Sequence, residues 1–294
     1  MMRYTITLTL ATLFPLPALA EVPRVVTDIP PVHALVAQVM GDLGQPVLLL
    51  AKGADEHDFA LKPSQMGEIS DAALVVWVGP ELTPWLGRAL EGSGAAQLAL
   101  LDAPGTRTRP YADGEEDHDH AGIDPHAWLD PGNASLWLGL IAGDLARLDP
   151  ENATIYAANA AAAQARLGAL DAEVAAILAP VKDKPFVTFH AAYGYFTAHY
   201  GLRPAPSLAL GDAAAPGAAR VAALQAQVAA DHIACLFPEA QHDPALLTVL
   251  TEGTGARIGG TLDPVGSGYD AGPGAYAAVL KGIAETLAEC LAVE

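Results

Sequence analysis

The sequence predicts an α/β protein of two lobes, each a parallel sheet flanked by helices, joined by one long rigid helix. Short apolar runs alternate with stretches of helical spacing, which is the pattern of a parallel sheet covered by helices. This alternation occurs twice, on either side of an alanine-rich tract. A chain of 294 residues is long enough for two domains of ordinary size.

The first twenty residues are expected to lie outside both lobes. Arg3 gives a short positive start, an apolar run follows to residue 16, and Ala18-Leu19-Ala20 has the small-x-small pattern of a cleavage site. A membrane span needs ~20 apolar residues, so this run is too short for one. We therefore predict a signal peptide at 1–20 and an exported, soluble protein from Glu21 onward.

The first lobe is predicted over residues 21–149. Its buried strands are recognised as short apolar runs, and its helices as stretches with apolar residues three or four apart. The expected strands are 25–29, 47–51, 74–79 and 97–101, and the expected helices include 32–40 and 62–72.

The linking helix is predicted over residues 150–180. Between 151 and 179 the chain is rich in alanine, the best helix former, and Gly168 is its only glycine or proline. At 1.5 Å per residue such a helix spans ~40 Å. A flexible linker would be rich in glycine and serine, so a rigid connection is favoured.

The second lobe is predicted over residues 181–294 and repeats the alternation of the first. The expected strands are 186–190, 205–210, 233–237 and 257–259, and the expected helices are 191–200, 218–230, 244–252 and 274–291.

Charge and cysteine content narrow the possible functions. The formal net charge of −19 repels nucleic acid and anionic lipid, so neither is expected as a partner. Cys235 and Cys290 are the only cysteines, and in an oxidising compartment an isolated pair favours a disulfide over a metal site or a redox centre.

Four residues are candidates for metal ligands: His57, His126, His190 and Asp263. Each follows a predicted strand or precedes a predicted helix, where an α/β sheet presents its ligand groups. Two come from each lobe, so they predict a tetrahedral site in the cleft. Three imidazoles and one carboxylate favour Zn²⁺, because Mn²⁺, Mg²⁺ and Ca²⁺ prefer oxygen. The ligands form no local motif, so spacing alone leaves each histidine open to a simple structural role.

Several sequence blocks together resemble a known family, and they appear in the family's order along nearly all of the exported chain. The blocks are GADEHDF at 53–59, LKPS at 61–64, ALVVWVGP at 73–80, DPHAWLDP at 124–131, FHAAYGYF at 189–196 and TLDP at 261–264. The chain is thereby similar to the zinc-binding, ZnuA/AztC-like solute-binding proteins (cluster A-I) of bacterial ABC transporters.

The resemblance implies periplasmic capture of Zn²⁺ with high affinity and delivery to an ABC-type importer. It matches His57, His126, His190 and Asp263 to the family's ligands and Cys235–Cys290 to a disulfide of its zinc members. Manganese-binding relatives carry a carboxylate at the position of His190. The acidic stretch Asp117–His120 is short where many zinc relatives carry a long histidine-rich insert, so its role is open between scavenging zinc and a solvated loop.

Other polar residues are expected to have supporting roles. Glu56 beside His57 is expected to make hydrogen bonds in preference to binding metal, and His33 to be structural or to support a ligand. Surface or packing roles are predicted for the three remaining histidines of the second lobe: His199, His232 and His242.

The predicted partner is the membrane permease of a zinc importer, with a zinc metallochaperone as a further candidate, and the protein is expected to be a monomer. A zinc enzyme is disfavoured, because Asp263 would fill the coordination position that a hydrolytic water needs. A manganese importer subunit and a periplasmic zinc buffer remain as alternatives.

Overall fold

The computed structural model describes residues 21–57, 59–111, 122–209 and 216–293. The predicted signal peptide and the stretch Asp117–His120 lie outside the described residues. Within the described part of the chain we find no helix with the length and apolarity that a membrane crossing requires.

The first sheet contains four parallel strands in the order β2-β1-β3-β4. The strands are β1 (Val25–Thr27), β2 (Val47–Leu48), β3 (Leu74–Trp77) and β4 (Ala96–Ala99). Three helices connect them, and each begins at a proline, whose fixed φ suits the first helical turn. These helices are α1 (Pro30–Met40), α2 (Pro63–Ser70) and α3 (Pro84–Leu90). All four predicted strands are present in shortened form, with β4 beginning one residue before its predicted start, whereas no helix was predicted at α3.

The second sheet contains three parallel strands in the order β5-β6-β7. The strands are β5 (Phe186–Thr188), β6 (Cys235–Phe237) and β7 (Arg257–Ile258). The helices of this lobe are α6 (Gly194–Tyr200), α7 (Ala218–Ala230) and α8 (Ala245–Thr251), with a 3-10 turn, η4 (Ala191–Tyr193), before α6. The predicted helices of this lobe are therefore confirmed, with the helix at 191–200 starting as a 3-10 turn.

The predicted strand at 205–210 is wrong as a regular strand. The segment runs beside β5 but pairs with it only at two isolated bridges, Phe186–Pro204 and His190–Ala209. Pro204 and Pro206 have no backbone N–H to donate, so a continuous ladder cannot form there. Leu210, at the end of the predicted strand, lies outside the described residues.

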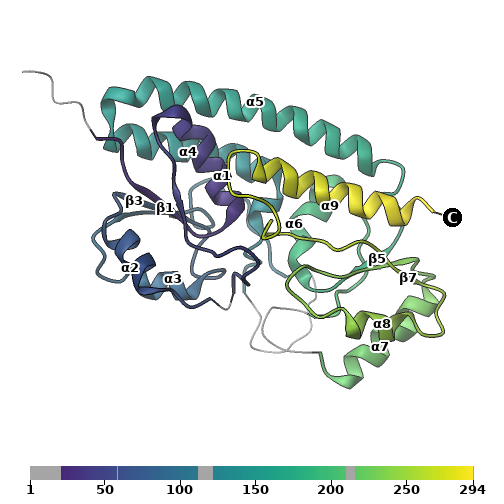
Figure 1. Cartoon of the computed structure of the whole chain (residues 1–294). Helices are drawn as coiled ribbons and strands as arrows, with labels where there is room; N and C mark the ends of the chain where they lie inside the picture. The colour runs from purple at the N-terminus through teal and green to yellow at the C-terminus, as the bar shows by residue number, and fades with distance from the viewer. Residues whose placement is uncertain (1–20, 58, 112–121, 210–215, 294) are drawn as a thin grey trace, which may run out of the picture.

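A layer of long helices spans both sheets (Figure 1). It consists of α4 (Pro131–Leu148), α5 (Ala153–Leu178) and the C-terminal α9 (Ala275–Leu291). The predicted linking helix is confirmed as α5, preceded by the 3-10 turn η3 (Pro150–Asn152). Its 26 residues correspond to ~39 Å of length. Figure 1 shows α5 running from the first lobe to the second, and α5 packs against α1, α4 and α9.

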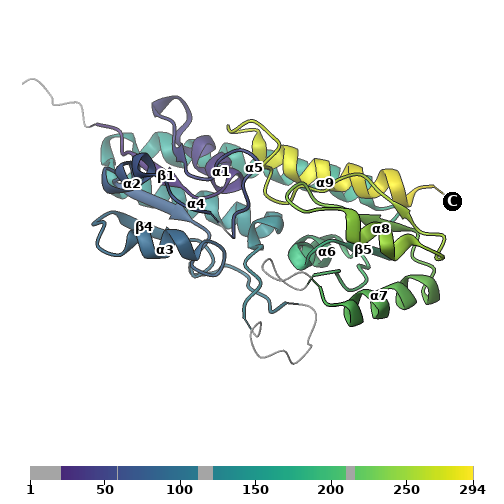
Figure 2. The ribbon, with the colours of Figure 1, turned by 60° about the horizontal axis from the view of Figure 1, so that its bottom comes forward.

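The apolar core is continuous between the lobes. One cluster of buried side chains includes Ile29 of the first lobe, Leu167 of α5, Phe186 of β5 and Ile283 of α9. A disulfide between Cys235 of β6 and Cys290 of α9 ties the second sheet to this helical layer, as predicted. Figure 2 shows strands β1 and β4 of the first lobe beside strand β5 of the second.

Candidate metal centre

Three histidines from distant parts of the sequence meet between the lobes. His57 lies in the loop between β2 and α2, His126 directly precedes the 3-10 turn η2 (Ala127–Leu129), and His190 follows β5. The ring centroids are 5.5 Å apart for His57–His126, 6.3 Å for His57–His190 and 5.2 Å for His126–His190. One ring nitrogen from each histidine lies within 4.8 Å of the others, a spacing that a single metal ion can bridge.

The separation of two ring nitrogens is compatible with a tetrahedral zinc ion. His126 Nε2 and His190 Nε2 lie 3.3 Å apart. In a tetrahedral site with Zn–N bonds of ~2.0–2.1 Å, two ligand nitrogens are separated by about 3.3–3.4 Å. The two imidazoles therefore already stand at the distance that a shared Zn²⁺ requires.

Asp124 fixes the orientation of the His126 ring. Its Oδ1 accepts hydrogen bonds from the His126 backbone N–H at 3.0 Å and from Nδ1 at 2.8 Å. With the proton on Nδ1, the lone pair of Nε2 points to the centre, the arrangement that metal-binding histidines share. Burial lowers the pKa of His126, which favours the neutral imidazole that a metal ion needs.

Glu239 holds His190 in the same way. Its carboxylate accepts hydrogen bonds from the backbone N–H of His190 at 3.2 Å and from the ring Nδ1. The Glu239 side chain is buried, so its hydrogen bonds are not shared with solvent. Glu239 was not among the predicted site residues, although it follows strand β6 closely, at the end of the sheet where the other candidates lie.

Glu56 is the carboxylate nearest to His57. Its Oε1 lies 3.6 Å from His57 Nε2, longer than a direct hydrogen bond. Burial raises the pKa of Glu56 to about 7, and the backbone carbonyl of Glu56 accepts a hydrogen bond of 2.8 Å from Trp85 Nε1. This loop is therefore anchored to α3, and Glu56 lies beside His57 but, among the described residues, belongs to neither group of mutually close metal donors.

Asp263 is placed differently from the histidines. Its carboxylate accepts hydrogen bonds from the backbone N–H groups of Gly266 at 2.8 Å, Ser267 at 3.0 Å and Gly268 at 2.8 Å. It belongs to neither group of mutually close metal donors among the described residues. The next residue, Pro264, accepts a hydrogen bond from Trp128 Nε1, which fixes the turn near the segment that carries His126. Its role as a ligand stays a prediction.

The remaining histidines have varied surroundings. His33 Nε2 lies 3.2 Å from the carbonyl of Pro46 inside the first lobe, in keeping with a structural role. His199 lies between Asp130 and Asp171, which raise its pKa, and His232 is exposed. His242 was predicted to be a surface or packing residue, yet its Nε2 lies 3.6 Å from Glu239.

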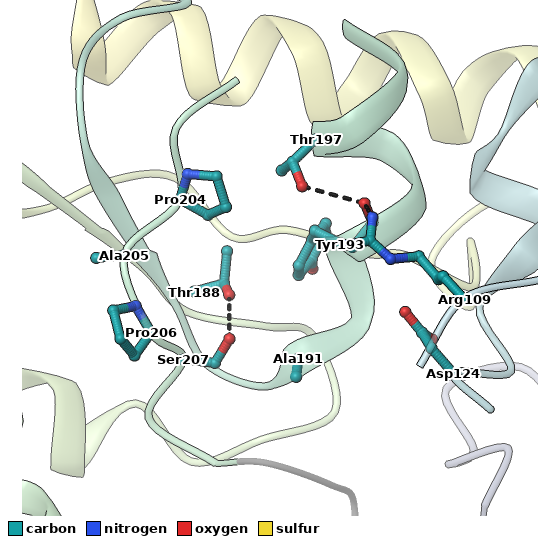
Figure 3. Close-up of a pocket in the computed structure, with 11 residues that line it drawn as sticks. Arg109, Asp124, Thr188, Ala191, Tyr193, Thr197, Pro204, Ala205, Pro206 and Ser207 are labelled. Carbon is teal, nitrogen blue, oxygen red and sulfur yellow. Dashed lines mark hydrogen bonds between the residues drawn. The ribbon is translucent and has the colours of Figure 1, made fainter. Parts of the chain in front are cut away.

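A cavity of about 310 Å³ with both polar and apolar lining residues lies beside the centre (Figure 3). Figure 3 shows Arg109 and Asp124 on one side of it and the hydrogen-bonded pair Thr188–Ser207 on the other. Asp124 therefore both lines this cavity and holds His126. Tyr195 donates its hydroxyl to the Asp124 carbonyl and accepts from the Arg109 N–H, which joins the first lobe to α6 at this point.

Comparison with known proteins places the chain in a family. A family model described as the periplasmic component A of a zinc-uptake complex, ZnuA, matches residues 25–290. The high-affinity zinc uptake system protein ZnuA of Paracoccus denitrificans (strain Pd 1222) is 50% identical over 309 residues, covering 95% of each chain.

Solved structures agree with this match. A zinc-bound deletion mutant of ZnuA superposes with a TM-score of 0.78 at 26% identity, covering 92% of this chain and 99% of that one. FpvC from Pseudomonas aeruginosa, in complex with Mn²⁺, has a TM-score of 0.82 at 21% identity, again covering 92% and 99%, and shares the fold. The chain therefore belongs to the ZnuA family of periplasmic zinc-uptake components.

Proposed function

We propose that the protein captures Zn²⁺ in the periplasm with high affinity and delivers it to the membrane permease of an ABC-type importer. The main support is the pair of Nε2 atoms 3.3 Å apart, each on an imidazole whose other nitrogen is held by a buried carboxylate. Such a preset pair binds a borderline cation without first reorganising the protein. The homologue in Paracoccus denitrificans is named for zinc uptake, in keeping with this function.

The proposed ligands are His57, His126, His190 and Asp263. For Asp263 to bind, its carboxylate would have to exchange hydrogen bonds from its own turn for the metal. Glu56 is the competing fourth ligand, because its buried carboxylate lies beside His57. Comparing Asp263→Asn with Glu56→Gln decides between them, since only loss of the true ligand should weaken zinc binding severely.

The three imidazoles disfavour the manganese alternative. Mn²⁺ prefers oxygen donors, whereas three of the four proposed ligands supply nitrogen. A protein with this site should retain Zn²⁺ when both ions are offered. The decisive experiment is competitive loading of metal-free protein with equal Zn²⁺ and Mn²⁺, followed by elemental analysis; retention of manganese in preference to zinc would contradict the proposal.

Transport and buffering differ in their need for a permease. A transport protein should stimulate the ATPase activity of its cognate permease complex in vesicles and load them with zinc, whereas a buffer should do neither. Reconstitution with the permease and ATPase of the same organism tests this point.

We further propose that the protein acts as a monomer without catalytic activity and that a zinc metallochaperone is a candidate donor.

A further inference from the structure

We propose that Glu239 and His242, together with His190, form a second, outer zinc position through which the ion enters and leaves the three-histidine centre. This inference rests on the proposed zinc function and extends it to the route of the ion. Donor atoms of His190, Glu239 and His242 lie within 4.8 Å of one another, the same criterion that the three histidines meet. Among the described residues these are the two groups that meet it.

The geometry of the outer group suits a metal ion. Glu239 Oε2 lies 3.6 Å from His242 Nε2, near the ~3.3–3.5 Å that separates two ligands of tetrahedral zinc. The His242 ring is stacked on Phe189, with centroids 4.4 Å apart and planes within 7° of parallel. Because stacking limits the rotation of the ring, Nε2 stays directed toward the carboxylate.

Glu239 can serve both groups. A carboxylate oxygen has more than one lone pair, so Oε2 can accept the Nδ1–H hydrogen bond of His190 and also approach a cation at His242; for His190 itself to bind that cation through Nδ1, its proton must first move to Nε2. His190 belongs to both groups, with Nε2 directed to His126 and Nδ1 to Glu239. One imidazole and one carboxylate therefore connect the inner and outer positions.

The exposed fractions of the side chains indicate which of the two positions an ion reaches first from solvent. The side chain of His242 is 20% exposed, whereas those of His190 and His126 are 3% and 0% exposed. The side chain of His57 is 13% exposed, so His242 is the most exposed of the four histidines, and an ion arriving on its side meets it before the buried His190 and His126. Because His190 and Glu239 are shared, the outer position is expected to hold zinc in transit and the chain to hold one tightly bound ion.

The test isolates the outer position by removing a ligand that belongs to the inner one alone. His126→Ala should abolish tight binding and leave a weaker zinc site made by Glu239, His242 and His190. Adding His242→Phe retains an aromatic ring to stack on Phe189 but removes Nε2. We expect this second change to weaken the residual site at least tenfold, since even loss of a ligand's hydrogen-bond partner costs roughly that much.

Kinetics provide a second measurement in the otherwise unchanged protein. Stopped-flow mixing with zinc and a fluorescent chelator should show that His242→Phe lowers the rate of zinc capture by about tenfold. This is the size of effect expected when the outer position loses one ligand. His232→Asn is the matched control, because His232 is exposed, belongs to neither donor group, and has the positive φ of 52° that asparagine tolerates. This control should leave both capture and equilibrium binding unchanged.

The outcomes separate the two proposals. If the unaltered protein binds no zinc, the proposed function fails. If it binds one zinc tightly, but His126→Ala retains no weaker site or His242→Phe changes neither that site nor the rate of capture, the outer position is overturned and the proposed function stands. Circular dichroism of each variant confirms that the comparison is made between folded proteins.

Discussion

At the residue scale, two carboxylates prepare the metal centre before any ion arrives. Asp124 holds the Nδ1 side of His126 and Glu239 holds that of His190, so both rings present Nε2 to the same point. A buried polar group without a partner would destabilise the fold, and here each carboxylate and each Nδ1 satisfies the other. Zinc affinity is therefore expected to depend on residues that never touch the ion.

The first prediction concerns these two carboxylates. Asp124→Asn or Glu239→Gln should lower zinc affinity by about 10–100-fold and leave one zinc per chain, because the ligands remain but lose their fixed orientation. Competition with a chelator of known affinity measures the change. Asp71→Asn, at an exposed carboxylate, is the control and should bind like the parent. Unaltered affinity in both carboxylate variants would show that ring orientation is not limiting.

The second prediction concerns Asp28, which lies just after β1. Its carboxylate accepts hydrogen bonds from the backbone N–H groups of Ile29 and Val78. Burial raises its pKa to about 7, so the folded protein binds a proton there more tightly than the unfolded chain does. The stability contributed by this proton is complete below pH ~4 and is lost as the pH rises toward 7, by about 1.4 kcal/mol per pH unit.

Asp28→Asn removes this dependence. We expect the free energy of unfolding of the metal-free parent, relative to the variant, to fall between pH 4 and pH 7 and to stay level above that range. Urea titrations of both proteins at half-unit pH steps provide the measurement. Parallel pH profiles for parent and variant would mean that Asp28 does not retain a proton in the folded state.

Some residues of the site could be predicted from the sequence, and others could not. His57, His126 and His190 could be found because each follows a strand or precedes a helix, and the structure brings them together. Glu239 also follows a strand but was not singled out, and its contact with His190, 49 positions away, is established only by the fold. His242 was missed for the same reason, since its significance comes from its distance to Glu239.

At the element scale, periodicity predicted the regular helices and strands well and failed where backbone donors are missing. The helix at 218–230 has the predicted bounds, because its amphipathic pattern is unbroken. The segment 205–210 has the apolar character of a strand, but Pro206 and the preceding Pro204 prevent a ladder. Helix α3 was not predicted, although α6 and α8 have the same length of seven residues and were.

The third prediction tests α5 as a rigid connection. Gly168 is exposed in the middle of this helix, and a Cβ added there would meet no atom within 4 Å. Gly168→Ala should therefore raise the free energy of unfolding by roughly 0.5–1 kcal/mol, because alanine has less backbone freedom to lose. The urea midpoint should rise with an unchanged slope.

Gly41 is the matched counterexample at the end of α1. It has a φ of +56°, and an added Cβ would lie 2.6 Å from Asn159 Nδ2 of α5, whose side chain donates to the carbonyl of Val39. Gly41→Ala should therefore destabilise the protein. If Gly41→Ala proved as stable as Gly168→Ala, the contact between α1 and α5 would not have the importance assigned to it.

At the scale of the whole molecule, the two lobes behave as parts of one packed body. The core continues from the first sheet through α5 and α9 to the second sheet, and a disulfide fastens α9 to β6. Opening the lobes as rigid halves would expose part of this core to water, at roughly 25 cal/mol for each Å² of apolar surface. The sequence predicted the two lobes and the helix, but the shared core depends on tertiary packing that periodicity does not report.

The last prediction follows from this continuity. Zinc that binds only the folded state stabilises it by RT ln(1 + [Zn]/Kd), about 4 kcal/mol at a thousandfold excess over Kd, so the melting temperature should rise by on the order of 10 °C. Because the lobes share a core, the radius of gyration from small-angle X-ray scattering should be the same with and without zinc. The combined His57→Ala/His126→Ala variant serves as the control and should show a much smaller thermal shift at the same zinc concentration, because only the weaker group of His190, Glu239 and His242 remains. A rise in melting temperature together with a smaller radius of gyration would instead indicate that the lobes close around the ion. In that case the shared core would not hold the two lobes in one fixed arrangement in the metal-free protein.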